Sequence, residues 1–260
     1  MRRIVGAALV GVFAATAFAA SALGALPEFG RCVPAEGKTG EYSSAGCVKP
    51  AAGGKGGYKW VPGPGEKTKF TSFAGPVTLE TVGGFKILCS NGTIAGEYTG
   101  AKTAKATMSV LGCLEVGTGK LCQSNPAKNG EIEATGLEGE LGFIVGGSKP
   151  KVGLQLKLST PLPFECRSGL EPPSPKVLEG AFIGKIAPLN RMRETFKATY
   201  TALHGKQVPE KFEEGPAAVL TLKDVLSSKS EQAGLTIIGI EEKPKPLIIE
   251  NEEPLEIKAK

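Results

Sequence analysis

Beyond residue 65, apolar and polar residues alternate along the chain in short runs that Gly, Pro and Asn interrupt. The clearest run has an apolar residue at every second position, at Val152, Leu154, Leu156 and Leu158. Alternation with a period of two is typical of a strand with one buried face, and no window outside the first 25 residues keeps a helical period. The pattern therefore predicts a chain of short strands with no long helix.

About a dozen short strands are expected, separated by turn residues at short intervals. Gly83-Gly84 and Asn91-Gly92 follow the first two of them, and both dipeptides suit tight hairpin turns. We therefore expect a three-stranded meander over residues 78–100. Such a series indicates an all-β, antiparallel sandwich or closed barrel. The expected runs are 77–81, 85–89, 94–99, 107–111, 131–135, 139–145, 152–158, 177–186, 195–200, 217–222, 235–240, 247–250 and 255–257.

Three segments follow from this pattern. Residues 1–25 place two arginines before an apolar run and small residues, which is the layout of a cleavable signal peptide. Residues 26–65 are rich in Gly, Pro and Ser and poor in aliphatic residues, so we expect a loop-rich segment clipped by a disulfide. Residues 66–260 form the antiparallel β domain. We therefore expect a secreted protein, without a transmembrane segment once the signal is removed.

Composition supports the β assignment and limits the kinds of binding partner. The 36 glycines and 19 prolines disfavour long helices. Loss of Arg2 and Arg3 with the first 25 residues lowers the formal net charge from +5 to +3. This charge is too weak, and the lysines too scattered, to indicate nucleic acid. Cell-wall or other extracellular material is the expected kind of partner.

Six cysteines in an exported chain predict a disulfide framework. Fifteen pairings are possible, and short loops favour Cys32 with Cys47 and Cys113 with Cys122, which leaves Cys89 with Cys166. Zinc is the alternative, but the chain has no C-x-x-C motif and a single histidine. We therefore expect structural disulfides and no metal or other cofactor.

Catalytic signals are weak in this sequence. His204 is the only histidine and lies beside Gly205, as a solvated turn residue would, and no G-x-S-x-G motif is present. Glutamates alternate with apolar residues on the expected strands, which is typical of a solvated sheet face. Asp224 is the only aspartate, which disfavours calcium loops. We expect no enzyme activity, although a hydrolase that uses a pair of glutamates stays open as an alternative.

Aromatic residues of the N-terminal segment are the candidate binding residues. Tyr42, Tyr58 and Trp60 lie among stiff Pro and Gly turns, and interface energy concentrates in such aromatic anchors. The competing interpretation is that Trp60, the only tryptophan, is buried and docks the segment on the body. Exposure of its side chain separates the two.

Several short stretches also resemble a known group. They are "LPEFGRCV", "TLETVGG" followed by "ILC", "GEYTG", "LEGELG", "FEC", "GKQVPEKFEEG" and "NEEPLEIKA". Together they resemble a group of secreted proteins common in high-GC Gram-positive soil bacteria. The resemblance implies export and supplies no activity and no functional residues.

The leading hypothesis is an exported, non-catalytic β protein that acts by binding or as a structural module associated with the cell envelope. A closed barrel that carries a small apolar ligand is the alternative besides the hydrolase. A filled interior would count against the carrier.

Overall fold

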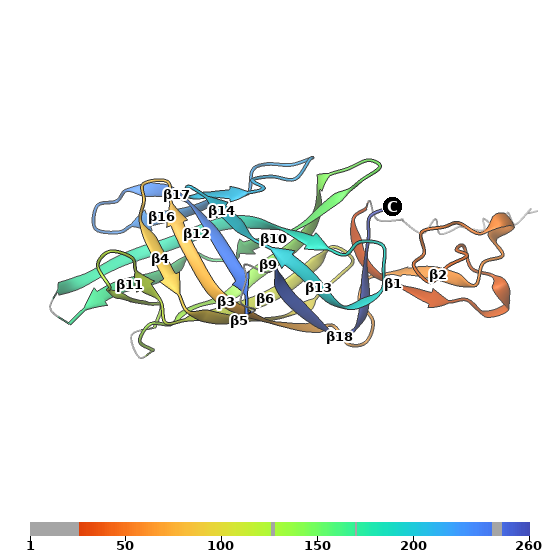
Figure 1. Cartoon of the computed structure of the whole chain (residues 1–260), viewed down its shortest axis with the longest axis horizontal. Coiled ribbons are helices and arrows are strands. Elements are labelled where there is room, and N and C mark those ends of the chain that lie inside the picture. Colours follow the sequence, from red (N-terminus) through yellow and green to blue (C-terminus); the bar gives the residue numbers. More distant parts are fainter. Residues whose placement is uncertain (1–25, 126–127, 170, 241–245) are drawn as a thin grey trace, which may run out of the picture.

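The computed structural model describes residues 26–125, 128–169, 171–240 and 246–260. Within them, sixteen strands join one antiparallel sheet, and β14 (Thr201–Leu203) pairs with β15 (Lys206–Val208) in a separate hairpin (Figure 1). The predicted all-β antiparallel class is confirmed, with more strands than the dozen expected. The predicted signal peptide, residues 1–25, lies outside the described residues.

Strand pairing closes this sheet on itself twice, so the closed alternative replaces the sandwich. In the described residues the pairs form two rings of eight strands, which share the long strands β3 (Lys69–Thr81) and β12 (Glu171–Ala187). Ring 1 adds β5 (Asn91–Tyr98), β6 (Thr103–Leu111), β9 (Ile132–Val145), β10 (Lys151–Leu158), β13 (Arg193–Thr199) and β18 (Leu247–Lys258). Ring 2 adds β4 (Lys86–Cys89), β7 (Leu114–Glu115), β8 (Leu121–Gln123), β11 (Leu162–Ser168), β16 (Leu220–Asp224) and β17 (Ser230–Gly239).

β3 passes from one ring to the other at Gly75 and Pro76. Its residues 69–74 pair with β5 in ring 1, and residues 77–80 pair with β4 in ring 2. The buried positions change from even to odd numbers at this point, so an extra residue keeps apolar side chains inside both rings. The predicted meander is therefore wrong in one detail: β4 and β5 both pair with β3, and Asn91-Gly92 begins β5 instead of forming a hairpin turn.

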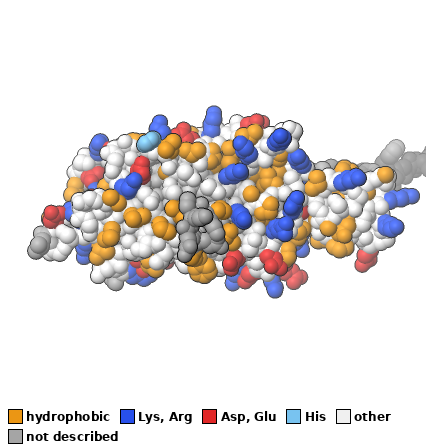
Figure 2. Space-filling view, in the orientation of Figure 1, with side chains coloured by type: hydrophobic (Ala, Val, Ile, Leu, Met, Phe, Trp, Pro, Cys, Tyr) orange, Lys and Arg blue, Asp and Glu red, His pale blue; other side chains and the backbone are white. Residues whose placement is uncertain are grey.

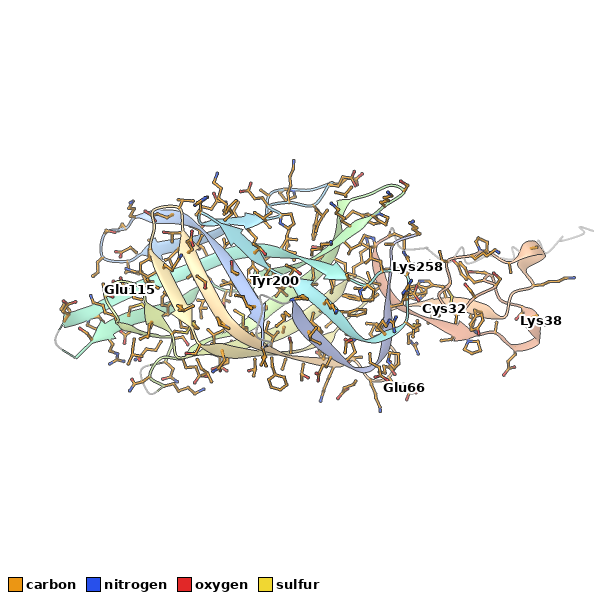
Figure 3. All side chains as sticks on the ribbon, in the orientation of Figure 1. Cys32, Lys38, Glu66, Glu115, Tyr200 and Lys258 are labelled. Carbon is orange, nitrogen blue, oxygen red and sulfur yellow. A yellow bond between two sulfur atoms is a disulfide. The ribbon has the colours of Figure 1, made fainter. Side chains whose placement is uncertain are left out.

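Side chains fill the space inside ring 1. The predicted alternation of β10 is confirmed, since Val152, Leu154, Leu156 and Leu158 are all buried. The cavity enclosed in ring 1, beside Tyr200, has a volume of only about 20 Å³ (Figure 3). This space suffices for about one water molecule, so the ring has a solid core.

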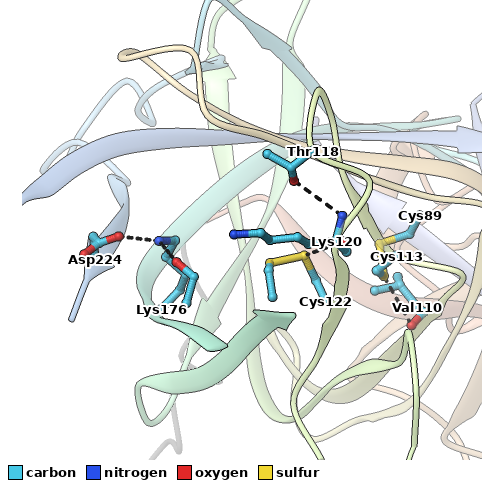
Figure 4. Close-up of a disulfide and its surroundings, with 10 residues drawn as sticks. Cys89, Val110, Cys113, Thr118, Lys120, Cys122, Lys176 and Asp224 are labelled. Carbon is cyan, nitrogen blue, oxygen red and sulfur yellow. Dashed lines mark hydrogen bonds and ion pairs between the residues drawn. A yellow bond between two sulfur atoms is a disulfide. The ribbon is translucent and has the colours of Figure 1, made fainter. Parts of the chain in front are cut away.

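Two disulfides join the strands of ring 2 where its strands are shortest, since β7 and β8 contain two and three residues. Cys89 bonds to Cys113, and Cys122 bonds to Cys166 (Figure 4). The predicted pairs Cys113–Cys122 and Cys89–Cys166 are therefore wrong, while Cys32–Cys47 is confirmed. The backbone N–H of Cys122 donates to the carbonyl of Cys113, and each side chain bonds instead to the strand on its outer side.

The N-terminal segment is less loop-like than predicted, because it adds two strands to the sheet. β1 (Glu28–Pro34) pairs with both β18 and β2 (Tyr58–Pro62). We call β1, β2 and residues 255–258 of β18 the neck. Residues 35–57, which include η1 (Glu36–Lys38) and η2 (Ala52–Gly54), project beyond ring 1 and are called the lobe (Figure 1).

Candidate functional site

The three predicted aromatic residues come together in the neck and at the base of the lobe. Trp60 is buried, with 8% of its surface exposed, and it packs with the Cys32–Cys47 disulfide. Tyr42 and Tyr58 are half-buried against the same cluster. Trp60 therefore has the position of a packing anchor, and it offers no free ring face to a ligand.

Polar contacts fix this aromatic cluster to the first and last strands. The Nε1–H group of Trp60 donates to Oε1 of Glu28 at 2.6 Å, and Nζ of Lys258 donates to the hydroxyl of Tyr42 at 2.6 Å. The same Nζ lies 4.2 Å from the centroid of the Tyr42 ring and 4.8 Å from that of Trp60. Cation–π contacts of this kind strengthen when they are removed from water.

Glu256 is the unusual residue of the neck. It is fully buried, and neither carboxyl oxygen has a hydrogen-bond partner among the described residues. Burial raises the pKa of Glu256 to about 7, although the nearby charge of Lys258 lowers it. Sequence reasoning missed this residue, since "LEIKAK" alternates as an edge strand with a solvated polar face would.

The lobe presents lysines to solvent. Lys38, Lys49 and Lys55 of the lobe and Lys59 of β2 are exposed, and no ion pair holds them within the described chain. Figure 2 shows basic side chains together with an acidic one on the lobe, and Figure 3 places Lys38 at its far end, away from Lys258. The Cys32–Cys47 disulfide and the aromatic cluster anchor the base of the lobe to the neck.

A second polar site, which sequence reasoning also missed, lies at the end of ring 2 farthest from the neck. Lys176 is buried and forms an ion pair with Asp224, its direct partner on β16 (Figure 4). They line a cavity of about 170 Å³ with Phe85, Lys229 and Glu231. The hydrogen bond from Lys176 and one from the backbone of Ser227 lower the pKa of Asp224 to about 2.

Every charge in this cavity has a partner. Nζ of Lys176 also donates to the hydroxyl of Ser174 at 2.7 Å, and Glu231 accepts from Thr81 at 2.7 Å and pairs with Lys229 at 2.6 Å. A network in which every polar group already has a partner has a structural role, because a ligand would have to replace existing contacts. The only sequence signal for Lys176 is a charged residue at a strand position that faces inward.

The other candidates for chemistry lie apart from one another. His204 is exposed at the turn of the β14–β15 hairpin, with a positive φ of 50° (Figure 2). A groove of about 530 Å³ on the outer face of ring 1 contains Glu97, Glu250 and Glu252. Lys69 lies in the same groove, directly opposite Glu97 on the neighbouring strand. The groove is therefore a mixed-charge surface rather than an isolated carboxylate pair.

Three further observations concern relatives of this chain, metal binding and membrane-spanning helices. No match was found for this chain among protein-family models, curated proteins or solved structures. The described residues contain no group of three or more His, Cys, Asp or Glu side chains placed to hold a metal ion. Within the same residues, no helix has the length and apolar character needed to span a membrane.

Proposed function

We propose that the protein is exported and acts by contact with anionic extracellular material, without catalysis. Three disulfides that use all six cysteines suit an oxidising compartment, where such bonds persist. The signal-like start of the sequence and its resemblance to secreted proteins of soil bacteria support the same assignment. Intact-mass measurement of secreted protein tests export, with an N-terminus between residues 20 and 26 as the expected result.

The lobe is the proposed contact surface. The observation that carries the proposal is its exposed, unpaired lysines, which outnumber its exposed glutamates Glu36 and Glu41, on a segment that the Cys32–Cys47 disulfide closes. Lysine is a hydrated point charge, so it detects the charge density of a polymer better than the shape of one ligand. An anionic cell-wall polymer fits this surface.

Sedimentation with purified cell-wall sacculi tests the lobe. Reversing its charge with Lys38→Glu, Lys49→Glu and Lys55→Glu together should abolish sedimentation of the protein with the sacculi. The matched control reverses three exposed lysines of ring 1, namely Lys105, Lys151 and Lys157. This control should keep most of the binding, and salt should weaken binding by the wild-type protein.

Other outcomes would contradict the proposal. Equal loss in both triple variants would show that net charge, and not the lobe, drives binding. If wild-type protein fails to bind sacculi at low salt, the contact function is wrong.

The two alternative functions have less support. A carrier needs an interior space for its ligand, and the cavity in ring 1 is about 20 Å³. A hydrolase that uses two glutamates needs a carboxylate pair free of competing charges, whereas Lys69 lies in the groove that gathers Glu97, Glu250 and Glu252.

A further inference from the structure

The side chain of Glu256 is enclosed on the face of the neck that carries Trp60. Its direct partner on β1 is Gly30, and a Cβ atom on Gly30 would lie 2.3 Å from the ring of Trp60. Side chains of paired residues lie on the same face of a sheet, so the Trp60 ring covers the surface beside Glu256. Leu255 and Ile257, on the opposite face, belong to the main core. Both faces of β18 are therefore buried over residues 255–258.

The charges around Glu256 leave it without an ion-pair partner. Lys258, two residues along β18, contacts Tyr42 and Trp60 instead. From β1, Glu28 adds another carboxyl, which accepts from Trp60. Arg191 and Arg193 flank Met192 at the start of β13, and both are exposed without an ion pair to Glu256 among the described residues.

We propose that the neck is a pH-sensitive joint: protonated Glu256 allows β1, β2 and the lobe to pack on β18, and ionised Glu256 loosens them. A neutral carboxyl tolerates burial, whereas an unpaired carboxylate strongly favours water. This inference is independent of what the lobe binds, because it concerns only how the lobe is held.

The direction of the effect follows from linkage. The pKa of Glu256 is about 7 in the folded protein against an ordinary 4.5, so the folded neck retains a proton that the opened neck loses. Packing of the neck is therefore tightest below pH 4.5. It weakens between pH 4.5 and about 7, and it stays at the weaker level above that range.

Hydrogen exchange measured strand by strand on the full protein tests this joint. Glu256→Gln mimics the protonated carboxyl at every pH. At pH 8 it should slow exchange of the amides in β1 and β2 roughly a hundredfold relative to wild type, and at pH 4 the two proteins should match. Comparison at equal pH removes the intrinsic pH dependence of exchange. Glu252→Gln, an exposed glutamate of the same strand, is the matched control and should behave as wild type at both values.

Trp60 provides a second readout, because it is the only tryptophan and lies in the neck. Its emission in wild-type protein should shift to the red between pH 5 and 8 and should stay constant in Glu256→Gln. Unchanged exchange in Glu256→Gln at pH 8 would overturn the proposal. A uniform change across β5, β6 and the other ring strands would also overturn it, because the effect would then belong to the whole fold and not to the joint.

Discussion

At the scale of single residues, buried charges in this protein separate into a paired kind and an unpaired kind. Lys176 and Asp224 satisfy each other at the end of ring 2, whereas Glu256 is buried in the neck without a hydrogen bond. A charge that loses its partner inside a protein costs more than the pair contributes, because desolvation is no longer offset. The two sites should therefore respond differently to substitution.

The Lys176–Asp224 pair should respond asymmetrically. Asp224→Asn leaves a buried ammonium group with a weaker acceptor, so we expect the free energy of unfolding to fall by about 3 kcal/mol. Lys176→Met keeps the apolar stem and removes the charge, while Asp224 keeps its hydrogen bonds from Ser227, so the loss should be smaller. Urea unfolding at neutral pH measures both values. Equal losses, or a larger loss in Lys176→Met, would contradict this account.

The same pair predicts a loss of stability in acid. The pKa of Asp224 is lowered from 3.8 to about 2, so its contribution is complete above pH 3.8 and disappears as the pH falls towards 2. The difference in stability between wild type and Asp224→Asn should shrink over this interval. A difference that is constant down to pH 2 would show that the ion pair has no part in it.

Trp60 should behave as a core residue. Its emission at pH 5 should be blue-shifted and resistant to iodide, and Trp60→Ala should lower the free energy of unfolding by about 3 to 5 kcal/mol. Trp60→Phe, the milder control, retains much of the packing but leaves Glu28 without its donor, so an intermediate loss is expected. Red-shifted, freely quenched emission at pH 5 would instead restore Trp60 as an exposed binding residue.

At the scale of elements, the short strands β7 and β8 are stabilised by disulfide bonds. Strands of two and three residues provide few ladder hydrogen bonds, yet ring 2 closes through them. The bridges Cys89–Cys113 and Cys122–Cys166 attach them to β4 and β11, which have longer pairings.

Disulfide removal should therefore have a local effect. Replacing Cys122 and Cys166 by Ala opens a loop of 44 residues, and the chain-entropy relation gives a loss of about 4 kcal/mol. Replacing Cys32 and Cys47 opens 15 residues and should cost about 3 kcal/mol. Hydrogen exchange should show the first change in ring 2 and the second in the lobe. Peptide mapping without reduction that recovers Cys113 bonded to Cys122 would refute the connectivity.

At the scale of the whole molecule, β3 and β12 make one continuous core out of two rings. Each strand pairs within ring 1 along one half and within ring 2 along the other. Gly180 marks the transition in β12: its φ is +105°, and a Cβ atom there would lie 2.0 Å from the carbonyl oxygen of Val219. Only glycine suits both demands at this position.

A filled core predicts that small apolar molecules find no site inside. Wild-type protein should show no saturable binding of benzene by calorimetry, because the cavity of about 20 Å³ in ring 1 has no space for it. The cavity of about 170 Å³ in ring 2 is lined by charged side chains, which disfavour an apolar ligand. Leu156→Ala should create an apolar cavity in ring 1 and gain such binding, at a cost of about 2 to 5 kcal/mol in stability. Binding to the wild-type protein would return the carrier to consideration.

Much of this architecture could be predicted from the sequence because it depends on local pattern. Strands and turns follow from the alternation in β10 and from the abundance of Gly and Pro, because these preferences depend on residues close together in the chain. The even number of cysteines indicates that disulfides form. The sequence around Trp60 allowed two interpretations, an exposed binding residue and a buried packing anchor, and the second describes its position in the structure.

Features that join distant segments were decided only by the tertiary structure. Closure of two rings through β3 and β12, the pairing of β1 with β18 and the contact of Lys176 with Asp224 connect residues far apart in the chain. The cysteine partners depend on which strands become neighbours, and the burial of Glu256 depends on a sheet face that the N-terminal segment covers. No local pattern encodes these choices, because the free energy that selects them comes from packing the whole chain at once.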